Sequence, residues 1–93
     1  MKCFVYSVFD RCSGVYDRPW IARSDDEAER GFTDVCTAAD HPVSKHPDDY
    51  CLFRIGTYDD NTGELIGSPP EKVINGVEAV KRSQKVVNLN GGE

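Results

Sequence analysis

Residues 2–9 combine aromatic and β-branched side chains in an alternating pattern, which predicts a β-strand. Phe4, Tyr6 and Val8 share one face of that strand, and the opposite face is apolar as well, with Phe9 among its members. A strand that is apolar on both faces is expected in the centre of a sheet.

A turn is expected at residues 10–14, whose Asp, Ser and Gly content is typical of turns. Residues 15–23 predict a second strand, with Pro19 inside it. Because proline has no amide hydrogen for the strand ladder, this second strand should lie at an edge of the sheet.

The next element begins with a capping box, in which the Ser24 hydroxyl can accept from the third helical amide while Glu27 reaches back. An apolar stripe at helical spacing then predicts an amphipathic helix over residues 25–39, with Gly31 as its weakest position. The stripe consists of Ala28, Phe32, Val35, Cys36 and Ala39.

Residues 51–58 alternate again and predict a third strand. The hairpin connection that follows, at residues 59–63, has Gly63 as the expected left-handed residue. Residues 64–67 should return as a short strand, which the next Pro-Pro pair ends.

Residues 71–82 carry apolar side chains at helical spacing directly after that proline pair, so a second helix is predicted there. Residues 86–93 are expected to form a flexible C-terminal tail. A single domain would then cover residues 1–85.

The predicted order is strand, strand, helix, strand, strand, helix. Two hairpins joined by a helix favour an α+β fold, in which a small antiparallel sheet carries both helices on one face. A chain of 93 residues is long enough for one thin core of this kind.

The net charge is −5, from 11 basic and 16 acidic residues. This net negative charge argues against nonspecific electrostatic binding to nucleic acid, although it is compatible with a local basic face. No apolar run approaches the ~18 residues of a membrane span, and the N-terminal stretch lacks the features of a signal peptide. We therefore expect the chain to stay in the cytoplasm where it is made.

The four cysteines contain no C-x-x-C pair. In the absence of a signal sequence they are interpreted as reduced thiols, with a metal site or an oxidised pair as less favoured alternatives. No cofactor and no metal are expected. The cysteines are Cys3, Cys12, Cys36 and Cys51.

Both histidines lie in the stretch HPVSKHPDD, residues 41–49. With the neighbouring carboxylates they could hold a divalent metal or serve acid–base catalysis. However, Pro42 and Pro47 oppose a helix that would align the two rings. The stretch is predicted to be a rigid connecting loop, with a binding surface around Lys45 as the alternative, and enzymatic activity is not expected.

The segment SKHPDDYCLFRIGTYDDNTG, residues 44–63, follows VYSVFD near the N-terminus and the capped helix. Together they resemble the small non-structural protein of gokushovirus-type microviruses, which are tailless phages with small single-stranded DNA genomes. The resemblance covers most of residues 2–85. It implies a non-structural protein in the cytoplasm of the host bacterium, outside the virion. It also implies a DNA-binding regulator that turns genome replication toward single strands, by analogy with the replication-switch protein of other microviruses.

Single-stranded DNA as a partner requires aromatic side chains for stacking and cations for phosphate. For each candidate taken singly, an ordinary place in a sheet or on a solvated surface is the favoured interpretation, while the group as a whole could bind DNA. The candidates are Tyr16, Arg18, Trp20, Arg23, Lys45, Arg54, Tyr58, Lys81, Arg82 and Lys85.

The alternative is a protein-interaction module that regulates a viral or host replication or assembly protein without binding DNA. A homodimer that pairs its edge strands belongs to the same class. The acidic balance favours this alternative. A basic face with exposed aromatic rings would support DNA binding, whereas an exposed apolar patch would support a protein partner.

Overall fold

A computed structural model describes the backbone of residues 1–91 and the side chains of residues 1–84. The chain forms one antiparallel sheet, two longer helices and two short helical turns. In chain order the elements are β1 (Lys2–Asp10), β2 (Val15–Tyr16), β3 (Trp20–Ala22), α1 (Asp25–Cys36), α2 (Pro42–Lys45), η1 (Pro47–Asp49), β4 (Tyr50–Asp59), β5 (Leu65–Asn75) and α3 (Gly76–Gly91).

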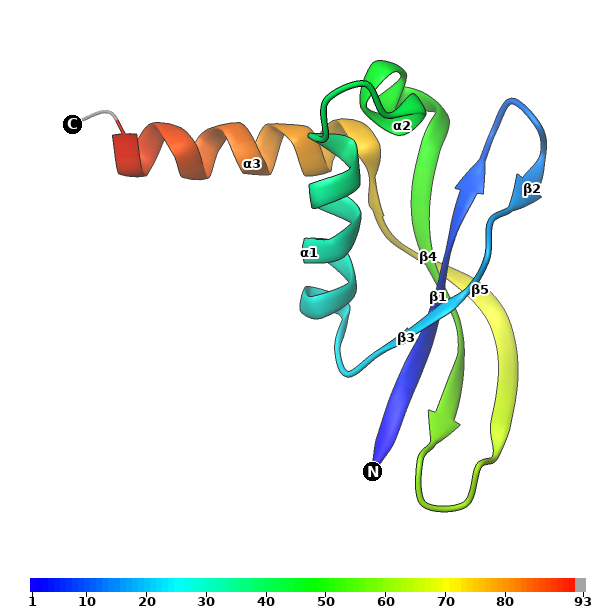
Figure 1. Ribbon diagram of the computed structural model, residues 1–93. Helices are drawn as coiled ribbons and strands as arrows, with labels where there is room; N and C mark the ends of the chain where they lie inside the picture. Colours follow the sequence, from blue (N-terminus) through cyan, green and yellow to red (C-terminus); the bar gives the residue numbers. More distant parts are fainter. Residues whose placement is uncertain (92–93) are drawn as a thin grey trace.

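The sheet has β1 in its interior, with β4 and then β5 on one side and with β2 and β3 on the other. Figure 1 shows α1 and α3 on the same side of this sheet, while no described helix covers the opposite side. The α+β class, the central position of β1 and the edge position of the second strand are confirmed. We call the two sides the helix-covered face and the helix-free face.

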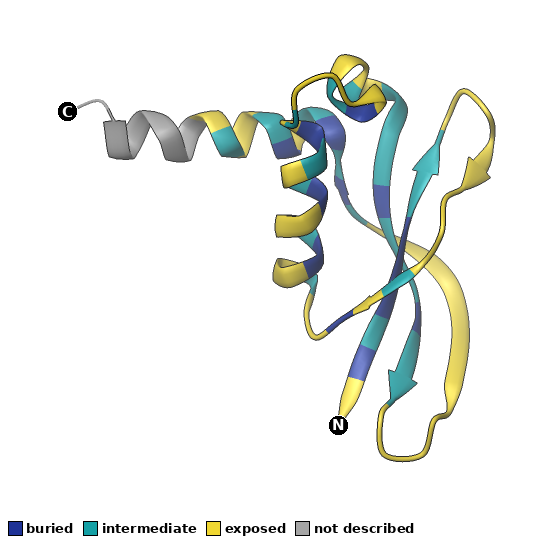
Figure 2. Ribbon diagram, in the orientation of Figure 1, coloured by how far each residue is buried: buried dark blue, intermediate teal, exposed yellow. Residues whose placement is uncertain are grey.

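The core lies between α1 and the helix-covered face of the sheet. Of the predicted stripe, Val35 is half-buried, and Ala39 is exposed beyond the end of α1. The other three residues, Ala28, Phe32 and Cys36, have at most 2% of their surface exposed (Figure 2). They pack against Tyr6, Leu52 and Ile74 of the sheet.

The capping box at the start of α1 forms as predicted. The Ser24 hydroxyl accepts a hydrogen bond from the amide of Glu27 at 3.2 Å. The Glu27 carboxylate in turn accepts from the amide of Arg23 at 3.1 Å. The helix ends at Cys36, three residues before the predicted end, with Thr37 as its C-cap.

The second predicted strand is divided into β2 and β3 by residues 17–19, where Pro19 lies. β2 pairs with the end of β1, and β3 pairs with its first half. Both parts remain at the edge of the sheet. Proline is compatible with this position, because an edge strand does not need the amide hydrogen that proline lacks.

The predicted end of the fourth strand at Pro69 and Pro70 is wrong. β5 continues to Asn75, and residues 71–75 are strand where a helix was expected. Between the pairs Gly56–Gly67 and Arg54–Glu71 the register shifts, so both prolines lie in an irregular stretch of an edge strand. Proline is tolerated in such a stretch because no ladder hydrogen bond is required of it there.

The second helix therefore begins at Gly76 and not at residue 71. A Cβ atom at Gly76 would overlap the carbonyl oxygen of Pro47, so this junction needs glycine for close packing. α3 continues through Gly91, and the expected tail is thus helical over residues 86–91, whereas residues 92–93 lie outside the described residues.

Residues 41–49 connect α1 to β4, but they are helical where a rigid loop without a helix was predicted. They form α2 and η1, and each begins with a proline at its first helical position. Proline suits that position because its amide would have no partner in the helix. The ring nitrogen Nδ1 of His41 accepts from the amide of Val43 at 3.2 Å and caps α2.

A bulge in the pairing of β1 with β4 changes which side chains share a face. Val5 pairs with Gly56 and Tyr6 pairs with Arg54, which leaves Ile55 as the extra residue. Strict alternation would place Phe53 and Tyr58 on opposite faces, but the extra residue brings both to the helix-free face.

Candidate functional site

Three aromatic rings form a cluster on the helix-free face. Phe9 and Tyr16 are paired across β1 and β2, with ring centroids 4.8 Å apart. Phe53 of β4 meets Tyr16 edge to face at 5.7 Å. The Tyr16 side chain is exposed, and no described helix packs over the cluster. We call Phe9, Tyr16 and Phe53 the aromatic face.

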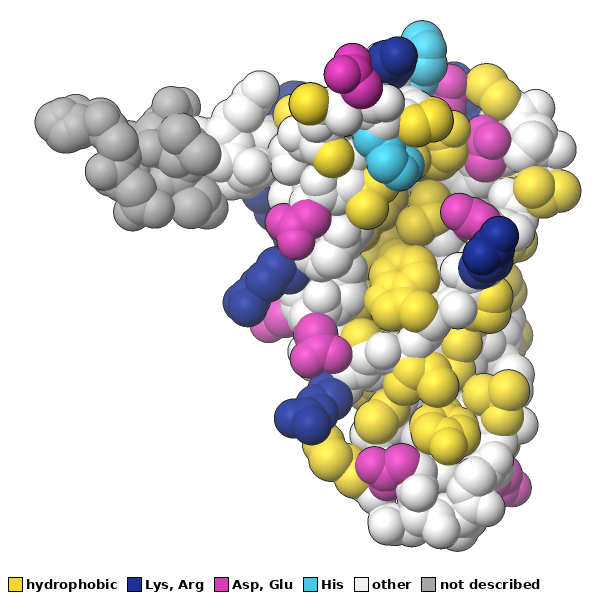
Figure 3. All heavy atoms as spheres, viewed as in Figure 1, with side chains coloured by type: hydrophobic (Ala, Val, Ile, Leu, Met, Phe, Trp, Pro, Cys, Tyr) yellow, Lys and Arg dark blue, Asp and Glu magenta, His cyan; other side chains and the backbone are white. Residues whose placement is uncertain are grey.

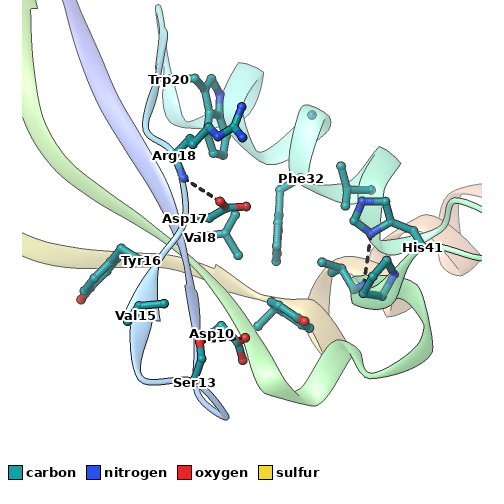
Figure 4. Close-up of a pocket in the computed structure, with 15 residues that line it drawn as sticks. Val8, Asp10, Ser13, Val15, Tyr16, Asp17, Arg18, Trp20, Phe32 and His41 are labelled. Atoms are coloured by element: carbon teal, nitrogen blue, oxygen red, sulfur yellow. Dashed lines mark hydrogen bonds between the residues drawn. The ribbon is translucent and has the colours of Figure 1, made fainter.

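A groove of about 630 Å³ opens on the other side of the same hairpin. Its walls are α1, the β1–β2 hairpin with the start of β3, and the short helix α2 (Figure 4). Phe32 stands in the middle of the groove and Trp20 at one end, and Tyr16 borders the groove with its ring turned away from it. We call this cavity the groove.

Polar side chains border the groove at two places. Asp10 and Asp17 belong to the β1–β2 hairpin, and His41 stands at the α2 end (Figure 4). Burial, followed by the nearby carboxylates of Asp10 and Asp49, raises the pKa of Tyr50, which also lines the groove. The hairpin end of the groove is therefore electronegative.

Arg54, a predicted DNA contact, is held in a network of side chains on the helix-covered face. Its guanidinium lies 3.3 Å from the Asp25 carboxylate and 3.2 Å from that of Glu71, and 5.1 Å from the centre of the Phe4 ring. The Tyr6 hydroxyl donates to Asp25 at 2.5 Å. Burial and this hydrogen bond raise the pKa of Tyr6 well above its ordinary value.

The structure brings only some of the other predicted residues together. Arg18 and Trp20 line the groove, and Tyr16 belongs to the aromatic face. Tyr58 is on the helix-free face but toward the opposite end of the sheet, paired with Cys3. The remaining predicted residues are spread over the start of α1, α2 and α3: Arg23, Lys45, Lys81 and Arg82.

Two further facts bear on the basic residues near the C-terminus. Arg82 forms an ion pair with Glu29 of α1. The side chain of Lys85 lies outside the described residues.

On the face that Figure 3 shows, the basic side chains of the described residues are not gathered in one patch. Figure 3 shows Lys and Arg side chains alternating with Asp and Glu along α1, and hydrophobic side chains gathered beside them. Arg11 and Lys72 also have carboxylate neighbours, at 2.9 Å from Asp49 and 3.7 Å from Glu78. By the criterion set from the sequence, this view favours an apolar binding surface over a purely phosphate-binding one.

The histidines and cysteines do not assemble into a larger site in the described part of the chain. Within it, no three His, Cys, Asp or Glu side chains are grouped so that they could hold a metal ion. All four cysteines are free thiols, and burial raises the pKa of Cys36 to about 11. Among the described residues, no helix is both long and apolar enough to cross a membrane.

Sequence reasoning did not propose Phe9 and Phe53 as site residues. Alternation placed each on a definite face of its own strand, but the helix-free side of the sheet depends on where α1 packs. The pairing of Ser7 with Phe53 would have identified them. Phe9 shares the face of Ser7 by alternation, so this pairing places Phe9 and Phe53 on the same face of the sheet.

The fold and these two surfaces define a small α+β protein with an open aromatic sheet face and an apolar groove. A family model described as Phage ORF5 protein matches residues 3–79. The chain therefore belongs to the Phage ORF5 protein family and is a phage protein, as the resemblance of its central segment predicted. No curated protein and no solved structure is significantly similar to the chain.

Proposed function

We propose that this phage protein binds single-stranded DNA through the aromatic face, without catalysis. The observation that carries the proposal is the cluster of Phe9, Tyr16 and Phe53 on a sheet face that no described helix covers. Exposed aromatic rings on an open antiparallel sheet are a recurrent platform for unpaired bases, and each stacked base contributes about 1–3 kcal/mol.

The resemblance of residues 44–63 supports a biological setting for this proposal. We propose that the protein belongs to a gokushovirus-type microvirus and acts in the cytoplasm of the host bacterium, outside the virion. There it regulates viral genome replication, in the step that turns synthesis toward single strands. A protein that covers emerging single strands would keep them from being copied back into duplex.

Phosphate contacts would come from cations on the same sheet. Lys72 of β5 is paired with Phe53 of the aromatic face. Arg18 and Arg23 flank β3 at the sheet edge, with Arg18 at the groove and Arg23 toward the end where Cys3 pairs with Tyr58. So few cations, on a chain with a net charge of −5, favour modest affinity without sequence preference.

The test is a titration of a dye-labelled oligothymidylate with the protein at low salt, followed by fluorescence anisotropy. Tyr16→Ala removes an exposed ring and should weaken binding about fivefold or more. Ile21→Ala is the matched control, because Ile21 is an exposed aliphatic residue on the same face, paired with Val5. No complex at tens of micromolar protein, roughly the range of nonspecific affinities, would reject the proposal.

A second candidate is a protein-interaction module that regulates a replication or assembly protein without touching DNA. Exposed Val15, Ile21, Leu65 and Ile66 favour it, since each is about half exposed or more. A homodimer through the β5 edge belongs to this candidate. Sedimentation of the protein over a range of concentrations tests the homodimer, and failure of the DNA titration would make the second candidate the leading one.

A further inference from the structure

We propose that the groove is a second binding site, which takes a segment of a partner protein with an apolar anchor residue and a lysine or arginine beside it. The groove lies on the helix-covered face, so the inference does not depend on DNA binding at the aromatic face. Three properties of the groove support it.

The first property is an apolar interior of suitable size. The cavity of about 630 Å³ falls within the range of roughly 300–1,000 Å³ that is usual for ligand pockets. Phe32, Val8 and Val35 supply apolar surface from both walls. A large aliphatic or aromatic side chain would gain about 25 cal/mol for each Å² of apolar surface removed from water.

The second property is a gap in the wall formed by α1. Gly31 lines the groove, and a Cβ atom added to it would meet nothing within 4 Å. Glycine costs helical stability at an interior position. Here the missing side chain of Gly31 leaves part of the groove open. A larger residue at position 31 would therefore block the groove without a clash at its Cβ atom.

The third property is the charge at the hairpin end. Asp10 accepts from the amide of Cys12 and the hydroxyl of Ser13, and Asp17 accepts from the amide of Arg18. Within residues 1–84 neither carboxylate has a lysine or arginine at ion-pair distance. A carboxylate has about four acceptor sites, so both can still receive a cation.

These charges select the class of partner. A basic side chain next to the anchor would meet Asp10 or Asp17, and the net charge of −5 would attract a basic segment from a distance. A nucleic-acid strand would instead bring phosphates toward two carboxylates. Arg18 at the rim is the one lysine or arginine among the described lining residues, and an acidic residue further along the segment could pair with it.

Trp20 makes the groove directly observable, because it is the single tryptophan of the chain and lines the cavity. The probe is the tryptophan-free peptide acetyl-Lys-Leu-Lys-Leu-Lys-amide, titrated into the protein while Trp20 emission is recorded. Matched peptides replace its lysines by glutamates or its leucines by serines. We expect the Trp20 emission to change with saturation for the first peptide alone.

Two variants locate the response. Gly31→Leu fills the groove and should weaken peptide binding about tenfold or more, while the better helix propensity of leucine keeps α1 folded. Asp17→Asn should weaken it about twofold to fivefold, the range of one exposed ion pair. Asp34→Asn, on an exposed part of α1 outside the groove, is the control and should change nothing.

Any of three results would overturn the proposal. The first is a change in Trp20 emission with the lysine–leucine peptide that is no larger than with the glutamate and serine peptides up to about 1 mM, a weak-binding limit. The second is a Gly31→Leu variant, shown to be folded by circular dichroism, that binds the peptide as tightly as the parent protein. The third is a change in Trp20 emission with oligothymidylate but not with the peptide, which would assign the groove to nucleic acid.

Discussion

Arg54 stands in an alternating strand, where an exposed cation would be free to contact phosphate, yet carboxylates and a ring surround it. Its guanidinium joins Asp25 at the start of α1 to Glu71 of β5 and covers the Phe4 ring. The residue therefore links a helix to two strands. Its contribution to DNA binding should be small, because its charge is already used inside the protein.

We expect Arg54→Met to lower the free energy of unfolding by about 1–3 kcal/mol, since Asp25 and Glu71 lose a charged partner. Urea denaturation measures this loss. Arg18→Met is the control, because Arg18 is exposed and should change stability by less than about 0.5 kcal/mol. A normal stability of the Arg54 variant with a large loss of DNA affinity would contradict this role.

The cysteines should differ widely in reactivity in the native protein. Cys12 is exposed, whereas Cys36 is buried and its pKa is raised to about 11 by burial. At pH 8 iodoacetamide should modify Cys12 first and Cys36 only through unfolding, as read by mass spectrometry of peptides. The hydrogen bond to Asp49 raises the pKa of Cys12, so Asp49→Asn should speed its labelling.

The raised pKa of Cys36 also makes the free energy of unfolding depend on pH. The unfolded thiol ionises near its ordinary pKa of 9.0, and the folded one only near 11. Between these values the folded state holds more protons than the unfolded state, so the free energy of unfolding falls as pH rises from 9 to 11. A rise in stability over that window would contradict the assignment of Cys36 to the core.

At the scale of elements, Gly31 inside α1 and Gly76 at the start of α3 have opposite roles. Gly31→Ala should stabilise α1 by about 0.5–1 kcal/mol, because the added methyl meets nothing and the unfolded chain loses freedom. Gly76→Ala should be destabilising, because its Cβ would overlap the Pro47 carbonyl. Melting temperatures of the two variants should therefore move in opposite directions, and a shift in the same direction would be inconsistent with this junction.

The start of α1 offers a separate test. Ser24→Ala removes the acceptor for the Glu27 amide and should cost about 0.5–2 kcal/mol of stability. Ser68→Ala is the matched control, since Ser68 is exposed in the irregular stretch of β5. Thermal unfolding followed by circular dichroism gives both values, and an unchanged midpoint for the Ser24 variant would argue against the cap.

Elements with a strong local pattern were predictable from the sequence, and α1 is the clearest case. Its cap and its apolar stripe depend on residues within one helix, so no knowledge of the rest of the fold was needed. β5 was not predictable in this way. Proline ends a strand only where its position in the ladder requires an amide hydrogen. Pro69 and Pro70 lie at a register shift in an edge strand, where no such hydrogen bond is required, and the sequence does not show this.

The site was predictable to a smaller extent for a related reason. Tyr16, Arg18 and Trp20 were recognised by residue type, but Tyr16 faces one side of the sheet and Trp20 lines the groove on the other. The face of Tyr58 relative to Phe53 depends on one extra residue, Ile55, in the ladder. Such bulges arise from strand pairing and leave little trace in the alternation of a single strand.

For the whole molecule, one thin sheet presents two surfaces of different chemistry. The helix-free face carries aromatic rings, and the helix-covered face carries a groove with an electronegative end. The β1–β2 hairpin contributes to both, through Tyr16 on one side and Asp17 on the other. A regulator that held a single strand on one face and a basic partner on the other would bring the two together without any catalytic group.

The salt dependence of DNA binding should report how little of the affinity is electrostatic. Each phosphate contact on a single strand releases roughly 0.7 of a counterion, so about two to four contacts give a log–log slope of about −1.5 to −3. Replacing Arg18 and Arg23 together by alanine should flatten this slope, because two cations that flank β3 at the edge of the sheet are removed. Tyr16→Ala should instead lower affinity at every salt concentration and leave the slope nearly unchanged, since stacking releases no counterions. Anisotropy titrations at several salt concentrations distinguish these effects, and a slope steeper than about −5 would mean that phosphate contacts, and not the aromatic face, supply the affinity.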